Sequence, residues 1–280
     1  MKLFIIIPAF NEEKFLAKTL ESLLKQTLLP TQIIIVDDNS TDETLKIAKT
    51  FTEAYELISY TVTNSTQDHQ PGSKVINAFQ KGLTKINSNF DILCKFDADL
   101  IFPDHYLEDI VKLFVKNPHC GIAGGFCSIQ KNGTWQTENL TNKDHIRGAL
   151  KAYRKECFED IGGLKHSMGW DTVDELLARY HGWEVITDTS LVVKHLKPTG
   201  NAYHASAKYK QGEAFKTMRY GFWLTLIASA KLAYKKRSLS FFWNTLQGFW
   251  KAPEEYIVSE EEGNYIRQYR WRNIRKKLGL

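Results

Sequence analysis

The sequence predicts an α/β fold, in which helices flank a mostly parallel sheet and an aromatic, basic α-helical extension follows. Short apolar runs rich in β-branched residues alternate with amphipathic stretches at helical spacing. Acidic and polar residues stand directly after several of those runs, and residues 208–280 hold fifteen Lys/Arg against six Asp/Glu. Alternation of strand and helix is typical of a parallel sheet covered on both faces, with ligands at the carboxyl ends of its strands.

Four apolar runs in the first hundred residues predict strands, and the stretches between them predict helices. The predicted strands are Leu3 to Ile7, Ile33 to Val36, Tyr55 to Val62 and Ile92 to Phe96, and the predicted helices are Glu12 to Gln26, one capped by Ser40 or Thr41, and Lys74 to Ile86. The polar segment 63–72, which contains Pro71, predicts a loop.

The following hundred residues predict a less regular series. A helix is expected after Pro103, a Gly-rich strand over Gly121 to Ile129, and a hairpin at Asn132-Gly133. The remaining predicted elements are a helix from Asp144 to Asp160 that Gly162-Gly163 ends, a helix from Asp171 to Tyr180, and strands at Val185 to Ile186 and Leu191 to Val193.

The composition excludes several classes of protein. With 280 residues, of which 43% are hydrophobic, the chain can bury a sizeable core and is not expected to be disordered. The net charge of +5 is uneven, so the acidic N-terminal part suits a metal site and the basic C-terminal part an anionic surface. Four cysteines without metal-ligand spacing predict reduced thiols and a cytoplasmic location. The apolar run before Pro8 is too short for a signal peptide or a membrane span.

Two acids, Asp97 and Asp99, follow the predicted strand that ends at Phe96. Residues two apart in an extended segment point the same way, so both carboxylates can face one cation. Oxygen ligands of this kind suit Mg²⁺ or Mn²⁺. Two acids at this spacing are weak evidence on their own, because acidic side chains at the end of a strand can also simply be exposed to solvent.

Polar residues also follow the first two predicted strands. A carboxylate of Asp37-Asp38 can accept hydrogen bonds from a base N–H or a ribose hydroxyl, while Asn39 or Ser40 can cap the next helix. The small residues within Pro8 to Glu12 allow a nucleotide to approach closely. Because the carboxyl ends of parallel strands share one edge of the sheet, these strand ends are expected to converge with Asp97 and Asp99.

The stretch IIIPAFNEEKFLAKTLESLLKQ, followed by IIIVDDNSTDETL and then FDAD, resembles glycosyltransferase family 2 over roughly the first two hundred residues. The resemblance implies the GT-A fold, with a Rossmann-like sheet. It also implies inverting transfer of a sugar from a nucleotide-diphosphate donor, UDP- or GDP-linked, to a hydroxyl acceptor. The expected catalytic domain covers 1–207, with a donor half at 1–100 and an acceptor half at 101–207, and the extension covers 208–280.

The resemblance assigns roles to individual residues. Asp38 is expected to contact the base, Lys74 to approach the nucleotide, and Asp99 to be the more direct ligand of a divalent metal. The donor-binding residues that it implies are Pro8, Ala9, Asn11, Glu12, Asp38, Lys74 and Asp97, and the metal ligands are Asp99, Asp97 and His195. A histidine at the position of His195 is a ligand in some relatives, although a lone strand histidine is also compatible with a structural role.

Family members carry a Glu-Asp pair about a dozen residues before a Gly-aromatic pair, and its Asp is the catalytic base. Counting back from Gly182-Trp183 gives Trp170 and Asp171, so the glutamate is missing. The pair Asp174-Glu175, one turn further, is the rival, with Asp174 as the possible base, and a helix cap is the other interpretation of Asp171. Gly169 and Trp170 are expected to bind the acceptor, because aromatic rings suit the faces of sugars.

The extension places aromatic residues beside Lys235-Lys236-Arg237 and ends in a basic segment. This pattern suits peripheral contact with the cytoplasmic face of an anionic membrane, and a lipid-linked acceptor would fit such a location. Packing against the catalytic domain or within a homo-oligomer is the alternative, and no nucleic-acid partner is expected. A catalytically inactive nucleotide-sugar-binding protein and a sugar-phosphate nucleotidyltransferase remain alternative functions, although the latter's Gly-rich phosphate loop is missing after the first strand.

Overall fold

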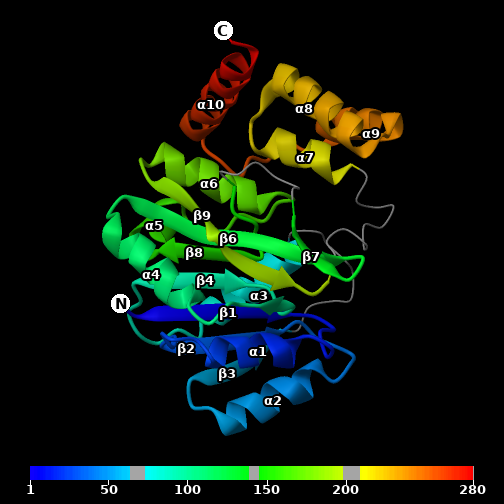
Figure 1. Ribbon diagram of the computed structural model, residues 1–280. Coiled ribbons are helices and arrows are strands. Elements are labelled where there is room, and N and C mark those ends of the chain that lie inside the picture. The colour runs from blue at the N-terminus through cyan, green and yellow to red at the C-terminus, as the bar shows by residue number, and fades with distance from the viewer. Residues whose placement is uncertain (64–72, 139–144, 198–208, 280) are drawn as a thin grey trace.

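The computed structural model describes residues 1–63, 73–138, 145–197 and 209–279. Within them, nine strands form one sheet with the order β3-β2-β1-β4-β8-β6-β9-β5, and β7 pairs with β6. Helices flank this sheet, and four further helices gather at the end of the molecule opposite α2 (Figure 1). The predicted α/β class with a helical C-terminal region is therefore confirmed.

The β1–β4 region is the parallel part of the sheet. Its elements are β1 (Leu3–Ala9), α1 (Leu16–Leu24), β2 (Gln32–Asp37), α2 (Thr44–Ala54), β3 (Ile58–Val62), α3 (Ser73–Leu83) and β4 (Ile92–Phe96). Strand β1 lies parallel to both β2 and β4, and β2 lies parallel to β3. All four predicted strands are confirmed, because strands buried on both faces have continuous apolar sequences.

The predicted cap of the second helix is wrong. Helix α2 begins after Glu43, not after Ser40 or Thr41. Those two residues instead bind the preceding loop: the Asn11 amide donates to Ser40 Oγ at 3.0 Å, and the Thr41 amide donates to Asn11 Oδ1 at 2.8 Å. The loop predicted at 63–72 lies outside the described residues, apart from Thr63.

The rest of the sheet is mixed. Its elements are β5 (Leu100–Ile101), α4 (Tyr106–Lys116), β6 (Cys120–Lys131), β7 (Thr134–Thr137), β8 (Leu150–Arg154), α5 (Lys155–Asp160), α6 (Trp170–Tyr180) and β9 (Glu184–His195). Strand β8 runs antiparallel to β4 and β6, whereas β9 runs parallel to β6. The predicted hairpin is confirmed, since Asn132 and Gly133 have φ of 50° and 79° between β6 and β7.

The helix predicted from Asp144 to Asp160 is wrong. Residues 150–154 instead form β8, and only 155–160 are helical. Leu150 and Tyr153 are three positions apart, a spacing that also fits a helix, and the buried Lys151 between them hides the apolar character of the strand. Asp144 lies outside the described residues.

The C-terminal helices form a compact group, comprising α7 (Lys210–Thr217), α8 (Gly221–Lys236), α9 (Leu239–Lys251) and α10 (Glu260–Leu278). Gly212 of α7 and Gly248 of α9 allow a very close crossing: a Cβ at Gly212 would lie 1.9 Å from the Thr245 carbonyl oxygen. Helix α10 contacts α6, where the rings of Tyr265 and Tyr180 are 5.6 Å apart. Among the described residues, no helix combines the length and apolar character needed to cross a membrane.

Candidate active site

Two acids and a histidine meet where β4 ends. Asp97 and Asp99 follow β4, and His195 is the last residue of β9. Pairing of Leu100 with His195 in the β5–β9 ladder places the imidazole beside Asp99, with Nε2 3.2 Å from Oδ2. The ligand atoms of Asp97, Asp99 and His195 all lie within 4.8 Å of one another. The structure therefore brings together the three residues predicted to bind metal.

The chemistry of this cluster fits a divalent cation. Asp99 is buried, and its Oδ1 has no hydrogen-bond partner among the described residues, nor has Nδ1 of His195. Buried polar atoms normally have hydrogen-bond partners. Two such atoms without partners at one place therefore favour a bound ligand. Carboxylate oxygens and an imidazole nitrogen suit Mg²⁺ or Mn²⁺.

Glu12 lies close to the same cluster. Its Oε1 accepts from Lys197 Nζ at 2.8 Å. Burial raises the pKa of Glu12, the Lys197 ion pair opposes this, and the charges of Asp99 and Asp97 add to the increase. Glu12 is therefore close enough to Asp97 and Asp99 for their charges to act on it.

The first two strand ends are held together by hydrogen bonds. The Asp38 amide donates to the Ala9 carbonyl at 2.8 Å, and the Asp38 carboxylate accepts from the Thr63 hydroxyl. Asn11, with φ of 54°, joins the two loops. Its side-chain oxygen accepts from Thr41, which makes Asn11 a support for the loop as well as a predicted donor contact.

Lys74, in the first turn of α3, faces the loop that follows β1. Its Nζ lies 5.6 Å from the centre of the exposed Phe10 ring, on the segment that links Pro8 and Ala9 to Glu12. Lys74 therefore approaches the same loop as the other residues predicted to bind the donor.

A cavity of about 340 Å³ connects the acidic cluster to α6. Its lining consists of Val75, Lys95, Asp97, Arg147, Gly148, Ala149, Met168, Gly169, Trp170 and Asp171. Lys95 is almost fully buried and pairs with Asp97 Oδ1. The predicted donor residue Asp97 and the predicted base Asp171 thus line one cavity, together with both predicted acceptor-binding residues.

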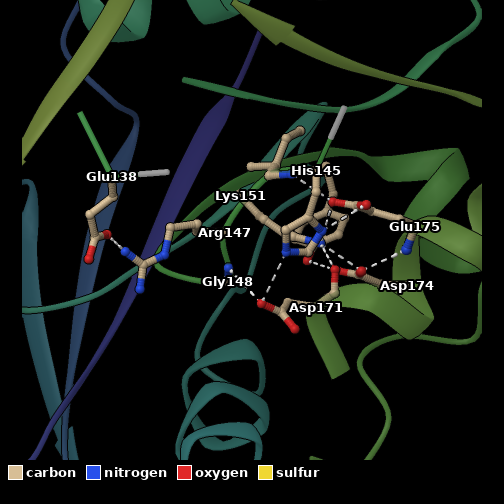
Figure 2. Close-up of polar contacts among 10 residues, drawn as sticks. Glu138, His145, Arg147, Gly148, Lys151, Asp171, Asp174 and Glu175 are labelled. Atoms are coloured by element: carbon tan, nitrogen blue, oxygen red, sulfur yellow. Dashed lines mark hydrogen bonds and ion pairs between the residues drawn. The ribbon is translucent and has the colours of Figure 1, made fainter. Parts of the chain in front are cut away.

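Asp171 is the second residue of α6, and Gly169 is the N-cap. The interpretation of Asp171 as a helix cap is therefore wrong. Its Oδ2 accepts from the Gly148 amide at 3.3 Å and lies 3.6 Å from His145 Nε2 (Figure 2). Burial raises the pKa of Asp171, but His145 and Lys151 outweigh burial and hold the pKa at about 2. Asp171 is therefore ionised at neutral pH.

Asp174 lies behind Asp171 in a buried network of charges. Its carboxylate accepts from Lys151 Nζ at 2.7 Å and from the Tyr153 hydroxyl, and its exposed fraction is only 1% (Figure 2). Glu175 completes the network: Oε1 is 3.1 Å from Lys151 Nζ, and Oε2 is 3.0 Å from His145 Nδ1. Burial raises the pKa of Asp174 to about 6, although Lys151 opposes this.

His145 is held between two acids. Burial lowers the pKa of its imidazole, but Asp171 and Glu175 outweigh burial and raise the pKa to about 9. A protonated His145 therefore donates toward both carboxylates at neutral pH. Lys151 also donates to the Asp171 carbonyl, so the network fixes both the backbone and the carboxylate of Asp171.

Trp170 is mostly buried, with 7% of its surface exposed. Lys95 Nζ and Lys151 Nζ lie 5.4 and 5.9 Å from the centre of its ring, and its edge packs on Gly148. A Cβ at Gly148 would lie 2.6 Å from this ring. Trp170 therefore forms a wall of the cavity, and little of its surface is available to a ligand.

Several charged residues at this site were not predicted from the sequence. These residues are Lys95, Glu138, His145, Arg147, Lys151 and Glu175, the last considered only as a neighbour of Asp174. The only local signal was a charge inside an apolar strand, as for Lys95 in β4. Arg147 pairs with Glu138 (Figure 2). Glu138 Oε2 lies 3.9 Å from His195 Nδ1.

Comparison with known proteins identifies the family. Residues 4–166 match the profile described as "Glycosyl transferase family 2", which is more than half of the chain. The chain belongs to glycosyl transferase family 2. Its relatives include the probable glycosyltransferase YdaM of Bacillus subtilis, 34% identical over 35% of this chain and 23% of YdaM. The uncharacterized glycosyltransferase MG025 of Mycoplasma genitalium is 33% identical over 59% of this chain and 57% of MG025, so the chain spans less than two thirds of these relatives.

Two solved transferase structures share the fold of this chain. The Staphylococcus aureus TarS fragment 1–349 in complex with UDP-GlcNAc is 17% identical, with a TM-score of 0.58 over 78% of this chain and 65% of that fragment. The mannosyltransferase PcManGT of Pyrobaculum calidifontis, in complex with GDP-Man and Mn²⁺, is 16% identical, with a TM-score of 0.57 over 89% of this chain and 68% of PcManGT. The GT-A fold expected for this family member is confirmed.

Proposed function

We propose that the chain is an inverting glycosyltransferase, which moves a sugar from a nucleoside-diphosphate donor to a hydroxyl of a glycan or lipid-linked acceptor. One observation carries the proposal: Asp97 of the metal-ligand cluster and Asp171 line the same cavity. Membership of family 2 supports this activity, and the structures that share its fold include complexes with UDP-GlcNAc and GDP-Man.

The donor is assigned to the loops after β1, β2 and β4. Asp99, Asp97 and His195 would hold Mg²⁺ or Mn²⁺, and the cation, when bound, supplies positive charge for the leaving diphosphate. The carboxylate of Asp38 would bind the base or ribose. The other residues assigned to the donor site are Pro8, Ala9, Asn11, Glu12 and Lys74.

Asp171 is the proposed general base. Within the described part of the chain, both contacts to its carboxylate involve Oδ2, which leaves Oδ1 for the acceptor hydroxyl. Oδ1 accepts the hydroxyl proton as the acceptor oxygen bonds to the anomeric carbon. The bond from that carbon to the diphosphate oxygen breaks, the nucleoside diphosphate leaves, and the single displacement inverts the anomeric configuration.

Asp174 is assigned to structural support. It is buried behind the cavity, and Lys151 and Tyr153 occupy its two oxygens. Proton transfer from an acceptor requires hydrogen-bond contact, which this position does not offer. Conversion of Asp174 to Asn is therefore expected to lower stability, whereas conversion of Asp171 to Asn lowers transfer.

The proposal is tested by incubating the chain with UDP- and GDP-linked sugars, Mn²⁺ or Mg²⁺, and sugar or lipid-linked hydroxyl acceptors. Metal-dependent release of nucleoside diphosphate with a new glycosidic product supports it. Thermal stabilisation by nucleoside diphosphate and metal without any release would support an inactive binding protein instead. Pyrophosphate release from nucleoside triphosphate and sugar phosphate would support a nucleotidyltransferase.

The Asp99→Ala variant tests whether this cluster provides the metal-dependent part of nucleoside-diphosphate binding. Since Asp99 offers a buried, unpartnered oxygen, its removal is expected to abolish the additional stabilisation that Mn²⁺ gives to the nucleoside-diphosphate complex. Unchanged metal-dependent affinity would contradict the assignment of this cluster.

A further inference from the structure

The α8–α9 pair exposes large apolar side chains at regular spacing. On α8 these are Trp223, Ile227 and Tyr234, and on α9 they are Leu239, Trp243 and Trp250. Steps of four and seven residues place the members of each set on one face of their helix. Trp223, Trp243 and Trp250 are each about two-thirds exposed, although buried aromatic rings are the usual case in a folded domain.

The two sets of side chains adjoin. Phe222 at the start of α8 contacts Trp250 at the end of α9, with ring centres 5.3 Å apart, and also contacts Trp223. Figure 1 shows the pair at the end of the molecule farthest from α2. An extended aromatic surface of this kind indicates an interaction site.

The charge of the same pair is entirely positive. Residues 221–251 contain no Asp or Glu, and their cations are Lys231, Lys235, Lys236, Arg237 and Lys251. Burial lowers the pKa of Lys231, and the nearby charges of Lys277 and Lys235 lower it further. The basic end of α10 therefore adds to the same positive field.

We propose that the α8–α9 pair binds the surface of an anionic lipid bilayer. Trp and Tyr side chains favour the boundary between headgroups and acyl chains, and Lys and Arg beside them are attracted to anionic headgroups. With 16 and 13 residues, the two helices are shorter than the roughly 20 residues that span a bilayer, so the pair lies along the surface. This inference is independent of the proposed transferase activity.

A symmetric dimer through this surface is less favourable than membrane binding. It would bring two sets of five cations together without an acid from either pair to balance them. Helix α10 contacts α6 through Tyr265 and Tyr180, but this contact leaves the α8–α9 face exposed.

The full chain should float with phosphatidylcholine vesicles that contain phosphatidylglycerol, at low ionic strength. Binding should weaken strongly in about 1 M salt, where the Debye length is about 3 Å, and should be weak to vesicles of phosphatidylcholine alone. Absence from anionic vesicles at low salt would overturn the proposal, as would equal binding to neutral vesicles.

Two double variants test the two components. Lys235→Gln with Lys236→Gln should weaken the partition coefficient about twenty-fivefold, because each cation near an anionic surface contributes about fivefold. Trp223→Ser with Trp243→Ser should weaken it at least about tenfold by removing apolar area. The matched controls are Lys18→Gln with Lys49→Gln, and Val115→Ser, which change exposed residues of α1, α2 and α4 and should leave binding unchanged.

Hydrogen–deuterium exchange of the unchanged chain keeps the test independent of the folding of the variants. Anionic vesicles should slow exchange within residues 221–251, whereas slowing elsewhere with none in this pair would overturn the proposal. Sedimentation velocity without lipid addresses the dimer: self-association that the Trp223→Ser, Trp243→Ser variant abolishes, without vesicle binding by the unchanged chain, would assign the face to a second copy.

Discussion

The two sides of the cavity use charged residues in opposite ways. In the cluster at the end of β4, Asp99 and His195 each keep a buried polar atom without a hydrogen-bond partner among the described residues. In the β8–α6 region, Lys151, Asp174 and Glu175 satisfy one another almost completely. The cluster at the end of β4 therefore has free ligand atoms, whereas the charged residues of the β8–α6 region fix the position of one carboxylate, that of Asp171. Substitutions on the first side should therefore change ligand binding, and those on the second should change catalysis and stability.

The largest expected effect is on catalysis. Asp171→Asn should lower the transfer rate by about 10²–10⁴-fold, because an amide cannot accept the acceptor proton in the reaction. Stabilisation by the nucleoside diphosphate and Mn²⁺ should persist, because Asp171 lies on the other side of the cavity. Initial rates and thermal shift measure the two properties, and transfer at the unchanged rate would remove Asp171 from the reaction.

The next effect is on stability. Lys151→Met removes the cation from a site with 0% exposure and leaves Asp174 and Glu175 without their shared partner. Loss of one member of a buried ion pair costs about 3–5 kcal/mol, which urea unfolding should show as a decrease in the free energy of unfolding. Lys155→Met, next to the strand and much more exposed, should change this free energy by less than about 1 kcal/mol. Equal effects of the two substitutions would contradict the importance of the network.

A smaller effect should depend on pH. The pKa of His145 is raised from 6.5 to about 9, so its contribution to stability is fully present below pH 6.5 and is lost as pH rises to 9. The loss is at most about 3 kcal/mol, since each pKa unit corresponds to 1.36 kcal/mol. Urea unfolding from pH 6 to 9.5 should show this decrease, and His145→Gln should remove it. A decrease of the same size in the variant would assign the effect to another group.

The smallest expected effect lies on the ligand-binding side. Asn11→Ala removes the acceptor for the Thr41 amide and replaces Asn, which tolerates a φ of 54°, by a residue that rarely adopts it. These changes should cost about 1–2 kcal/mol of stability and weaken nucleotide binding slightly. Asn11→Gly keeps the backbone conformation accessible, so it isolates the loss of the hydrogen bond. If Asn11→Ala binds nucleotide normally, the connection between the two loops does not shape the donor site.

The β1–β4 region was predictable because its signals are local. Buried parallel strands have continuous apolar sequences, and Asp38, Asp97 and Asp99 directly follow them. The positions of these acids therefore followed from the strand assignments. His195 was predicted only through the family resemblance, because its pairing opposite Leu100 depends on β9, which lies almost a hundred residues further along the chain.

The β8–α6 region could not be predicted in the same way. Lys151 falls within the helix predicted from Asp144 to Asp160, and only the position of β8 between β4 and β6 explains its burial. Its partners Asp174 and Glu175 are more than twenty residues away, and no motif links them to His145. The mutual compensation of these charges arises from tertiary packing, which single-sequence patterns do not encode.

The close crossing at Gly212 and Gly248 determines how the α8–α9 face meets its partner. Backbone contact at this crossing fixes α9 on α7, so the helices exist before any partner arrives. Binding would then require no coil-to-helix transition, and far-UV circular dichroism should be unchanged by vesicles while calorimetry shows no heat of helix formation. A bulkier residue at Gly248 would separate α9 from α7, so the α8–α9 pair would have to become ordered when it binds the membrane. The conformational entropy lost in that ordering would weaken binding.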